Sequence, residues 1–329
     1  MFKRLCNIRI IAFLILSFCL SVIATESGEV IIGSFNIANF GDTNEYERSL
    51  INLVNIIIDT KADLLCLQEI EPNDLGKAQA ERLLKLLNEA MIYYDQNTYE
   101  YVISEQSGDE KTVFFYRSPI NLESEIEFLP HDDDPDHDGT PTFQRVPTLG
   151  LFSAFGNEFY VVNGHFYTKP IGNTSEGRIE EFRALVNWLK VMNSQNDPKI
   201  IVLGDFNRFL GNKTPWKEFF FNNYMQYYRF PLLEAIMNDV QGFNYETEEA
   251  PSDQYSTTTS TKLSIYDQII INRHLYENAK IPVKFGQDVG IVAFDNNNEF
   301  EWFIDKWSNA TQILSDHRPV WIKLKFDID

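Results

Sequence analysis

The stretch Ile200-Ile201-Val202-Leu203-Gly204-Asp205-Phe206-Asn207, together with Ser315-Asp316-His317-Arg318-Pro319-Val320, decides the fold. In the first, a run of aliphatic residues predicts a buried strand that ends at Asp205 and Asn207. In the second, Asp316 and His317 come directly before a predicted strand over residues 319–325. Because a core position is costly for an unpaired polar side chain, we expect these residues to line a site at strand ends.

Four more predicted strands have a polar residue at one end. The residues are Asn36 after 30–35, Glu69 after 64–67, His165 after 159–163 and Asp267 before 269–271. Each alone is typical of a cap or a turn, but six such placements in one chain favour a common site. Paired strands are expected over 99–104 and 112–117, and apolar spacing predicts helices over 45–59, 74–90 and 178–192. No repeat or linker interrupts them, so residues 25–329 are predicted to form one α/β domain.

The first 24 residues have the pattern of a signal peptide. Lys3, Arg4 and Arg9 precede an apolar run from Ile10 to Ile23, and Val22-Ile23-Ala24 offers a cleavage site. That run has 14 residues, whereas a membrane span needs roughly 20. The sequence therefore predicts an exported protein, extracellular or periplasmic in a bacterium, without a transmembrane segment after cleavage; an uncleaved anchor is the alternative.

Composition limits the function. Hydrophobic residues make up 44% of the chain, as in folded proteins. Cys66 is the cysteine left after cleavage, so the mature chain forms no internal disulfide, and its apolar neighbours predict burial. Cleavage lowers Lys plus Arg from 28 to 25 against 48 acidic residues, a net charge of −23. Such acidity argues against tight non-specific binding of nucleic acid but suits a protein that concentrates cations.

The candidate residues match the needs of phosphodiester hydrolysis. Carboxylates and an amide oxygen are ligands for Mg²⁺ or Mn²⁺. A histidine held by a carboxylate keeps one tautomer and supports a positive charge, which suits proton transfer. Attack by water on a phosphodiester needs an activated nucleophile, stabilised charge on the phosphoryl group and a protonated leaving oxygen.

The ordered motifs resemble the endonuclease/exonuclease/phosphatase superfamily, whose type fold is DNase I-like. They are Ser34-Phe35-Asn36-Ile37, Leu67-Gln68-Glu69, Asn163-Gly164-His165, Gly204-Asp205-Phe206-Asn207, Tyr266-Asp267-Gln268-Ile269 and Ser315-Asp316-His317-Arg318-Pro319-Val320. The resemblance spans residues 30–325. It implies an α/β (mixed α+β) fold, a four-layer α/β sandwich of two packed mixed β-sheets flanked by helices.

Further stretches are similar to secreted DNase I-type nucleases. The pair 101–105 and 112–119 aligns with their strand pair and puts Glu110 at the carboxylate that supports a catalytic histidine. The stretch 143–147 aligns with one that carries a phosphate-contacting arginine, here Arg145. Glu71 departs from the pattern, because an arginine that enters the minor groove stands there in those nucleases. The stretches 165–170 and 205–210 look more like secreted bacterial members.

The resemblance implies a role for each candidate. Asn36, Glu69 and Asp316 would hold the divalent cation, and Asp205 would bind metal or orient the water. Asn207 would hydrogen-bond the phosphoryl oxygens. His165 supported by Glu110, and His317 supported by Asp267, would form the acid–base pair, with the assignment of acid and base left open.

Two other segments are singled out. Asp134, Asp136 and Asp138, with Gly139, match the opening of a calcium loop, for which an exposed acidic loop is the alternative. The aromatic stretch 216–230 predicts a helix on the core, with a lipid- or base-stacking surface as the alternative. Residues 132–139 and 256–261 are expected to be surface loops.

Together these observations predict a secreted, metal-dependent phosphodiesterase, an endonuclease acting on DNA, with RNA as a further candidate and no stable protein partner. Mg²⁺ or Mn²⁺ is the expected catalytic ion and Ca²⁺ a structural one. The alternatives are a lipid phosphodiesterase of the sphingomyelinase kind, a phosphomonoesterase, and a catalytically inactive binding protein.

Overall fold

The computed structural model describes residues 27–41, 50–131, 142–166, 176–195, 198–207, 227–241, 243, 250–258, 264–278, 284–296 and 314–328. The predicted signal peptide, residues 1–24, lies outside this part of the chain. So do Asp134, Asp136 and Asp138 of the predicted calcium loop. Among the described helices, none combines the length and the apolar character that crossing a bilayer requires.

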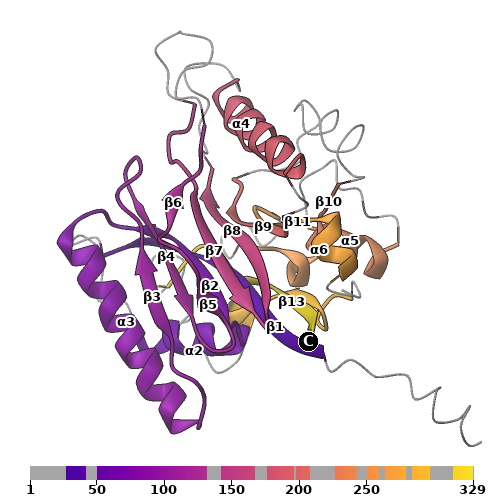
Figure 1. The fold of residues 1–329 in the computed structure, drawn as a ribbon. Coiled ribbons are helices and arrows are strands. Elements are labelled where there is room, and N and C mark those ends of the chain that lie inside the picture. The colour runs from indigo at the N-terminus through magenta and orange to yellow at the C-terminus, as the bar shows by residue number, and fades with distance from the viewer. Residues whose placement is uncertain are drawn as a thin grey trace, which may run out of the picture.

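Two mixed β-sheets form the centre of the molecule (Figure 1). The first has the order β12-β13-β1-β2-β4-β3, and the second β10-β11-β9-β8-β7-β5 with β6 also paired to β7. The first sheet comprises β1 (Ser27–Phe40), β2 (Leu64–Ile70), β3 (Glu100–Ile103), β4 (Lys111–Tyr116), β12 (Val289–Ile291) and β13 (Val320–Asp327). The second comprises β5 (Asn121–Leu122), β6 (Glu127–Phe128), β7 (Thr148–Ala154), β8 (Asn157–His165), β9 (Ile200–Asp205), β10 (Tyr228–Arg229) and β11 (Asp267–Asn272).

Helices cover the outer faces of both sheets. In Figure 1, α2 and α3 lie on the side of the first sheet, and α4, α5 and α6 lie on the side of the second. Their bounds are α2 (Leu50–Thr60), α3 (Asp74–Tyr93), α4 (Glu176–Asn193), α5 (Pro231–Asp239) and α6 (Arg273–Asn278). The four-layer α/β sandwich expected from the sequence is confirmed.

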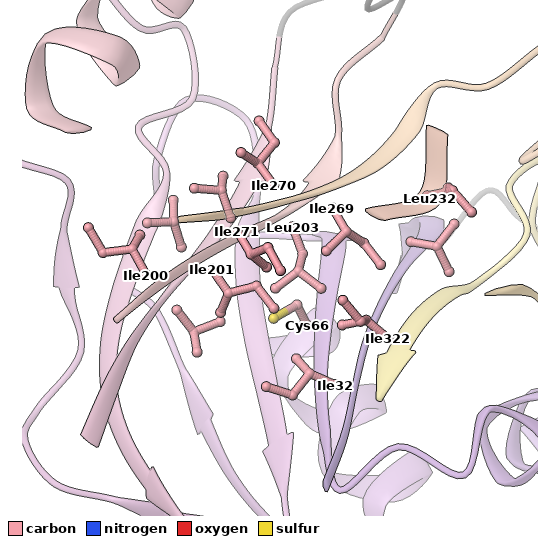
Figure 2. Close-up of a cluster of buried hydrophobic side chains, with 14 of the residues drawn as sticks. Ile32, Cys66, Ile200, Ile201, Leu203, Leu232, Ile269, Ile270, Ile271 and Ile322 are labelled. Carbon is pink, nitrogen blue, oxygen red and sulfur yellow. The ribbon is translucent and has the colours of Figure 1, made fainter. Parts of the chain in front are cut away.

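The alternation of strand side chains produces two cores. One face of the first sheet packs on α2 and α3 through residues such as Phe35, Leu65 and Leu53. Its other face meets the second sheet, where Ile32 and Cys66 join Leu203, Ile269, Ile271 and Ile322 (Figure 2). Cys66 is fully buried, as predicted, and burial raises the pKa of its thiol.

Hydrogen bonds between buried side chains join the two sheets just below the strand ends. Gln68 Nε2 donates to Asn163 Oδ1 at 2.7 Å, and Asn163 Nδ2 donates to the carbonyl of Leu67 at 3.2 Å. Gln68 and Asn163 have no exposed surface. Because an amide left unpaired in a core is costly, this contact fixes how the sheets sit against each other.

The structure corrects three sequence predictions. Strand β7 was not predicted, although its buried and half-buried residues alternate strictly, because Gly150 breaks the apolar run. The expected helix over 216–230 is wrong at its end, since Tyr228–Arg229 is strand β10; residues 208–226 lie outside the described part. Ser256, Thr257 and Thr258 are buried rather than part of a surface loop, because their backbone and hydroxyl groups hold neighbouring strands.

Gly204 offers a test of strand packing near the end of β9. It pairs with Gly164 of the parallel strand β8, has φ +147°, and a Cβ there would lie 1.8 Å from the Gly164 carbonyl oxygen. We expect Gly204→Ala to lower the free energy of unfolding by about 3–5 kcal/mol, from backbone strain and overlap together. Gly156→Ala is the control, because Gly156 has φ +76° but open space around it, and should cost about 1 kcal/mol. Urea unfolding of both variants measures this, and equal losses would contradict the close approach of β8 and β9.

Candidate active site

The polar residues singled out in the sequence meet at one edge of the sandwich. Strands β1 and β2 are parallel, as are β8 and β9, so Asn36, Glu69, His165 and Asp205 all lie at carboxyl ends. Asp267 begins β11, which runs antiparallel to β9, and pairs directly with Asp205. His317 stands three residues before β13 in the other sheet. The site therefore takes residues from both sheets.

The carboxylate of Asp205 lies at the centre of this group. Its Oδ2 is 3.5 Å from His165 Nε2 and 3.4 Å from His317 Nε2. Asn36 Nδ2 donates to the same oxygen at 3.0 Å. Asp205 is 1% exposed, so the interactions among these groups are weakly screened by water.

His165 is held by Glu110, the partner that the alignment indicated. Glu110 Oε2 is 2.7 Å from His165 Nδ1, so Nδ1 carries the proton and Nε2 faces Asp205. Burial alone would lower the pKa of His165, but the charge and hydrogen bond of Glu110, together with Asp205 and Glu69, outweigh it and raise that pKa to about 9. Burial raises the pKa of Glu110, whose second oxygen has no hydrogen-bond partner among the described residues. The pair therefore stabilises an imidazolium in a dry environment.

His317 has the equivalent arrangement on the other side. Asp267 Oδ2 is 2.8 Å from His317 Nδ1. Burial opposes a charge on His317, but Asp267 and Asp205 outweigh it and hold its pKa well above the ordinary value. Burial raises the pKa of Asp267 to about 6, against the pull of His317. Thr257 Oγ1 accepts the backbone N–H of Asp267 at 3.1 Å, which fixes the start of β11.

Two groups of side chains have the spacing of a cation site. Glu69, His165 and Asp205 form one, and Asp205, Asp267 and His317 form the other; in each, the ligand atoms lie within 4.8 Å of one another. Asn36 Nδ2 bridges Glu69 Oε1 at 2.7 Å and Asp205 Oδ2 at 3.0 Å, so an amide N–H occupies the point where the two carboxylates converge. Converging carboxylates held this way fit a hard divalent cation.

The amide oxygen of Asn36 points away from that point of convergence. It accepts the N–H of Ala38 at 2.9 Å. A ligand role for Asn36 therefore requires its amide to rotate. Glu69 has φ +61° and Asn207 φ +47°, and this unusual backbone aims both side chains into the site.

The other predicted residues lie around this centre. Asp316 is half exposed at the rim, with Oδ1 4.0 Å from His317 Nε2, and belongs to neither cation group. Asn207 Nδ2 donates to the carbonyl of Phe166 at 2.8 Å and approaches Asp205 Oδ2 at 3.2 Å. Arg145 Nε lies 2.7 Å from Asp109 Oδ1 and 3.4 Å from Glu110 Oε2. The structure thus brings every described candidate to one region, with Asp316 and Arg145 at its edge.

Sequence reasoning missed the residues that hold His317 in place. Arg318 is fully buried, and its guanidinium binds Asp295 through Nε at 2.6 Å and Nη2 at 2.7 Å, and Asp253 through Nη2 at 2.8 Å. The backbone N–H of Arg318 donates to the carbonyl of Thr257, and the hydroxyl of Thr257 accepts the backbone N–H of Asp267. The one signal for Arg318 in the sequence is its position directly after Asp316-His317. Asp253 and Asp295 belong to no motif, so nothing in the sequence distinguishes them from surface acids.

The Arg318 contacts give a stability prediction. Arg318→Met removes the guanidinium that binds the buried carboxylate of Asp295, and we expect a loss of about 3–5 kcal/mol in the free energy of unfolding. Arg183→Met, which removes an exposed ion pair to Glu180 on α4, should cost less than about 1 kcal/mol. Chemical denaturation of the two variants compares them, and a small effect at Arg318 would show that the ion-pair group does not hold this edge together.

The Glu110 contact predicts a change in the titration of His165. In Glu110→Gln the anionic partner is lost while burial remains, so the pKa of His165 should fall from about 9 toward or below its ordinary value. NMR of the imidazole protons over a pH series, in the presence of chelator, measures the shift. Glu105→Gln changes an exposed acid on the same loop and should leave that pKa in place. An unchanged pKa in Glu110→Gln would contradict the pairing.

Known proteins are similar to this chain over most of its length. Residues 33–317 match the endonuclease/exonuclease/phosphatase family. The chain is 25% identical over 315 residues to deoxyribonuclease-1 of Oryctolagus cuniculus, covering 93% of this chain and 96% of that protein. It is 24% identical over 303 residues to deoxyribonuclease-1 of Bos taurus, covering 89% and 91%.

Solved structures show the same fold. An endonuclease/exonuclease/phosphatase family protein from Bacteroides thetaiotaomicron superposes with a TM-score of 0.55 at 14% identity, covering 92% of this chain and all of that one. The human Nocturnin catalytic domain, with bound sulfate, gives 0.54 at 14% identity, covering 91% and 96%. The match over residues 33–317 and the site at the sandwich edge lead to one conclusion: the chain belongs to the endonuclease/exonuclease/phosphatase family and is a hydrolase acting on phosphoric ester bonds.

Proposed function

We propose that this chain is a secreted, divalent-metal-dependent phosphodiesterase, an endonuclease that hydrolyses DNA, with RNA as a further substrate. One observation carries the proposal: a buried carboxylate, Asp205, lies between the Nε2 atoms of two histidines, and each histidine is held by its own buried carboxylate. Similarity over most of the chain to deoxyribonuclease-1 from two mammals supports nucleic acid as the substrate.

In this proposal Glu69 and Asp205 would hold Mg²⁺ or Mn²⁺. Asp316 would contribute a ligand from the rim, and Asn36 would contribute one once its amide has rotated. When bound, the ion supplies Lewis-acid stabilisation of phosphoryl charge and lowers the pKa of a water molecule. Its charge would also lower the pKa values of His165 and His317 from those of the metal-free protein. The donor set fits such an ion because the carboxylates converge on one point.

The protein side chains then share the proton transfers. Asp205 orients the attacking water through its central carboxylate, and Asn207 hydrogen-bonds the phosphoryl oxygens once its amide leaves Asp205. His165 and His317 each present Nε2 to the reacting group, because Glu110 and Asp267 hold the opposite nitrogen. One imidazole protonates the leaving oxygen while the other stabilises the phosphoryl charge or takes the proton of the water. Arg145 contacts a phosphate of the substrate.

The proposal extends to the segments outside the described residues. Residues 1–24 act as a signal peptide, so the mature enzyme comprises one domain, residues 25–329, in an extracellular or periplasmic space. The run with Asp134, Asp136 and Asp138 binds Ca²⁺ and stabilises a chain whose one remaining cysteine cannot form an internal disulfide. Nucleic acid is the sole partner proposed.

Plasmid nicking tests the activity and its mechanism together. The protein should nick supercoiled plasmid with Mg²⁺ and lose that activity in chelator. His165→Ala should lower the rate about a hundredfold to ten-thousandfold, the usual contribution of general acid–base catalysis. Tyr93→Ala, at an exposed side chain near the end of α3, is the control and should keep the wild-type rate.

The alternatives give different outcomes in the same assay. Nicking that persists in chelator, or in His165→Ala, would contradict the mechanism. Hydrolysis of sphingomyelin or of an inositol phosphate without nicking would assign a lipid phosphodiesterase or phosphomonoesterase instead. Activity on none of these substrates would indicate a binding protein.

A further inference from the structure

Asp109 lies between the solvent and the cationic side chain at the edge of the site. Its Oδ1 is 2.7 Å from Arg145 Nε, and its Oδ2 is 3.3 Å from Arg145 Nη2. The carboxylate therefore occupies one full edge of the guanidinium, in the two-point manner that phosphate also uses. Asp109 is two-thirds exposed, whereas Arg145 is 16% exposed.

The turn that carries Asp109 is docked, so this contact is built into the fold. Residues 107–110 close on themselves through backbone hydrogen bonds between Ser107 and Glu110. Ser107 Oγ accepts the backbone N–H of Val146, next to Arg145. Gly108 has φ +63°, and a Cβ there would lie 2.4 Å from the carbonyl oxygen of Gln144. The turn thus fits against residues 144–146 so closely that only glycine is accommodated at position 108.

The same turn places two carboxylates on one guanidinium. Glu110 follows Asp109 directly, and its Oε2 lies 3.4 Å from Arg145 Nε as well as 2.7 Å from His165 Nδ1. Asp109 therefore balances the positive charge of Arg145, and Glu110 is shared between Arg145 and the imidazole of His165. Arg145 Nη1 donates no hydrogen bond to the described part of the chain, and 16% of the arginine side chain is exposed.

We propose that Asp109 is a specificity-determining residue that lowers the affinity of Arg145 for a phosphate group. This inference rests on the proposed function for the identity of the ligand, a phosphodiester. A phosphate that approaches Arg145 meets a guanidinium whose charge is already compensated by Asp109, and it comes near a solvent-exposed carboxylate. Arg145 therefore contributes less to phosphate binding than an arginine without a carboxylate partner would. The other phosphate contacts of the site contribute correspondingly more.

An orienting role for Asp109 makes the opposite prediction. If Asp109 mainly holds Arg145 in its binding position, its removal loosens Arg145 and weakens phosphate binding. Glu110 and the docked backbone of residues 144–146 already hold Arg145 in place, which argues for compensation of charge as the main effect.

The test measures binding without catalysis. In chelator, the full chain is titrated with inorganic phosphate, followed by NMR, and with a short fluorescein-labelled DNA oligonucleotide, followed by anisotropy. Asp109→Asn should lower both dissociation constants about threefold to fivefold, the size expected of one partly exposed ion pair. The dependence of the oligonucleotide affinity on salt should become steeper, because one more cationic group is available to phosphate.

Glu105→Gln is the matched control. It removes one negative charge from the same loop at an exposed residue that forms no ion pair with the described chain, and its effect should stay below about twofold. An effect of Asp109→Asn no larger than that of Glu105→Gln, or weaker binding in Asp109→Asn, would overturn the inference. In turnover, Asp109→Asn should lower KM with kcat unchanged.

Failure of the proposed function leaves a different pattern. If the wild-type protein does not nick plasmid but Asp109→Asn still binds inorganic phosphate more tightly, the inference holds and the nuclease assignment fails. If the wild type nicks plasmid and Asp109→Asn binds and reacts like the wild type, the assignment holds and the inference fails.

Discussion

The buried carboxylate of Asp205 is the constraint on which the rest of the site depends. A carboxylate that is 1% exposed must be compensated by its surroundings, and here two imidazoles and an amide lie around it. Each imidazole then needs its own support, which Glu110 and Asp267 provide from positions that are also buried. Three buried carboxylates and Glu69 face two imidazolium groups, so the centre keeps a negative charge that a divalent cation would balance.

That arrangement requires two sheets rather than one. Asn36, Glu69 and His317 come from the first sheet or its edge, whereas His165, Asp205 and Asp267 come from the second. A shift of one sheet relative to the other would move Asp205 away from Asn36 and His317 together. The hydrogen bond from Gln68 to Asn163 lies directly below, with each residue one or two positions from a site residue. Polar groups thus fix the position of one sheet relative to the other, because apolar packing alone would allow the two sheets to slide past each other.

Local patterns predicted one α/β domain and the polar residues at the strand ends, whereas the four-layer sandwich and the places of Glu110 and Arg145 were implied by the resemblance. Apolar runs locate strands, and the parallel pairs bring their polar ends to one edge. The pairing of each histidine with its carboxylate came from resemblance, since Glu110 lies 55 residues from His165. Contacts of Arg318 with Asp253 and Asp295 could not be predicted, because they join residues 65 and 23 positions away that look like surface acids. Ser256–Thr258 looked like a surface loop because polar composition does not reveal burial.

The distribution of charge bears on how so acidic a chain would act on the polyanionic substrate proposed for it. At a formal net charge of −20, the protein repels nucleic acid at long range, and Asp109 reduces what Arg145 contributes nearby. Screening removes most of the long-range repulsion beyond roughly 8 Å at physiological salt. Close attraction must then come from groups within the site, of which the protonated histidines and a bound cation are the strongest. In the proposed enzyme a bound cation would therefore contribute to substrate binding as well as to chemistry.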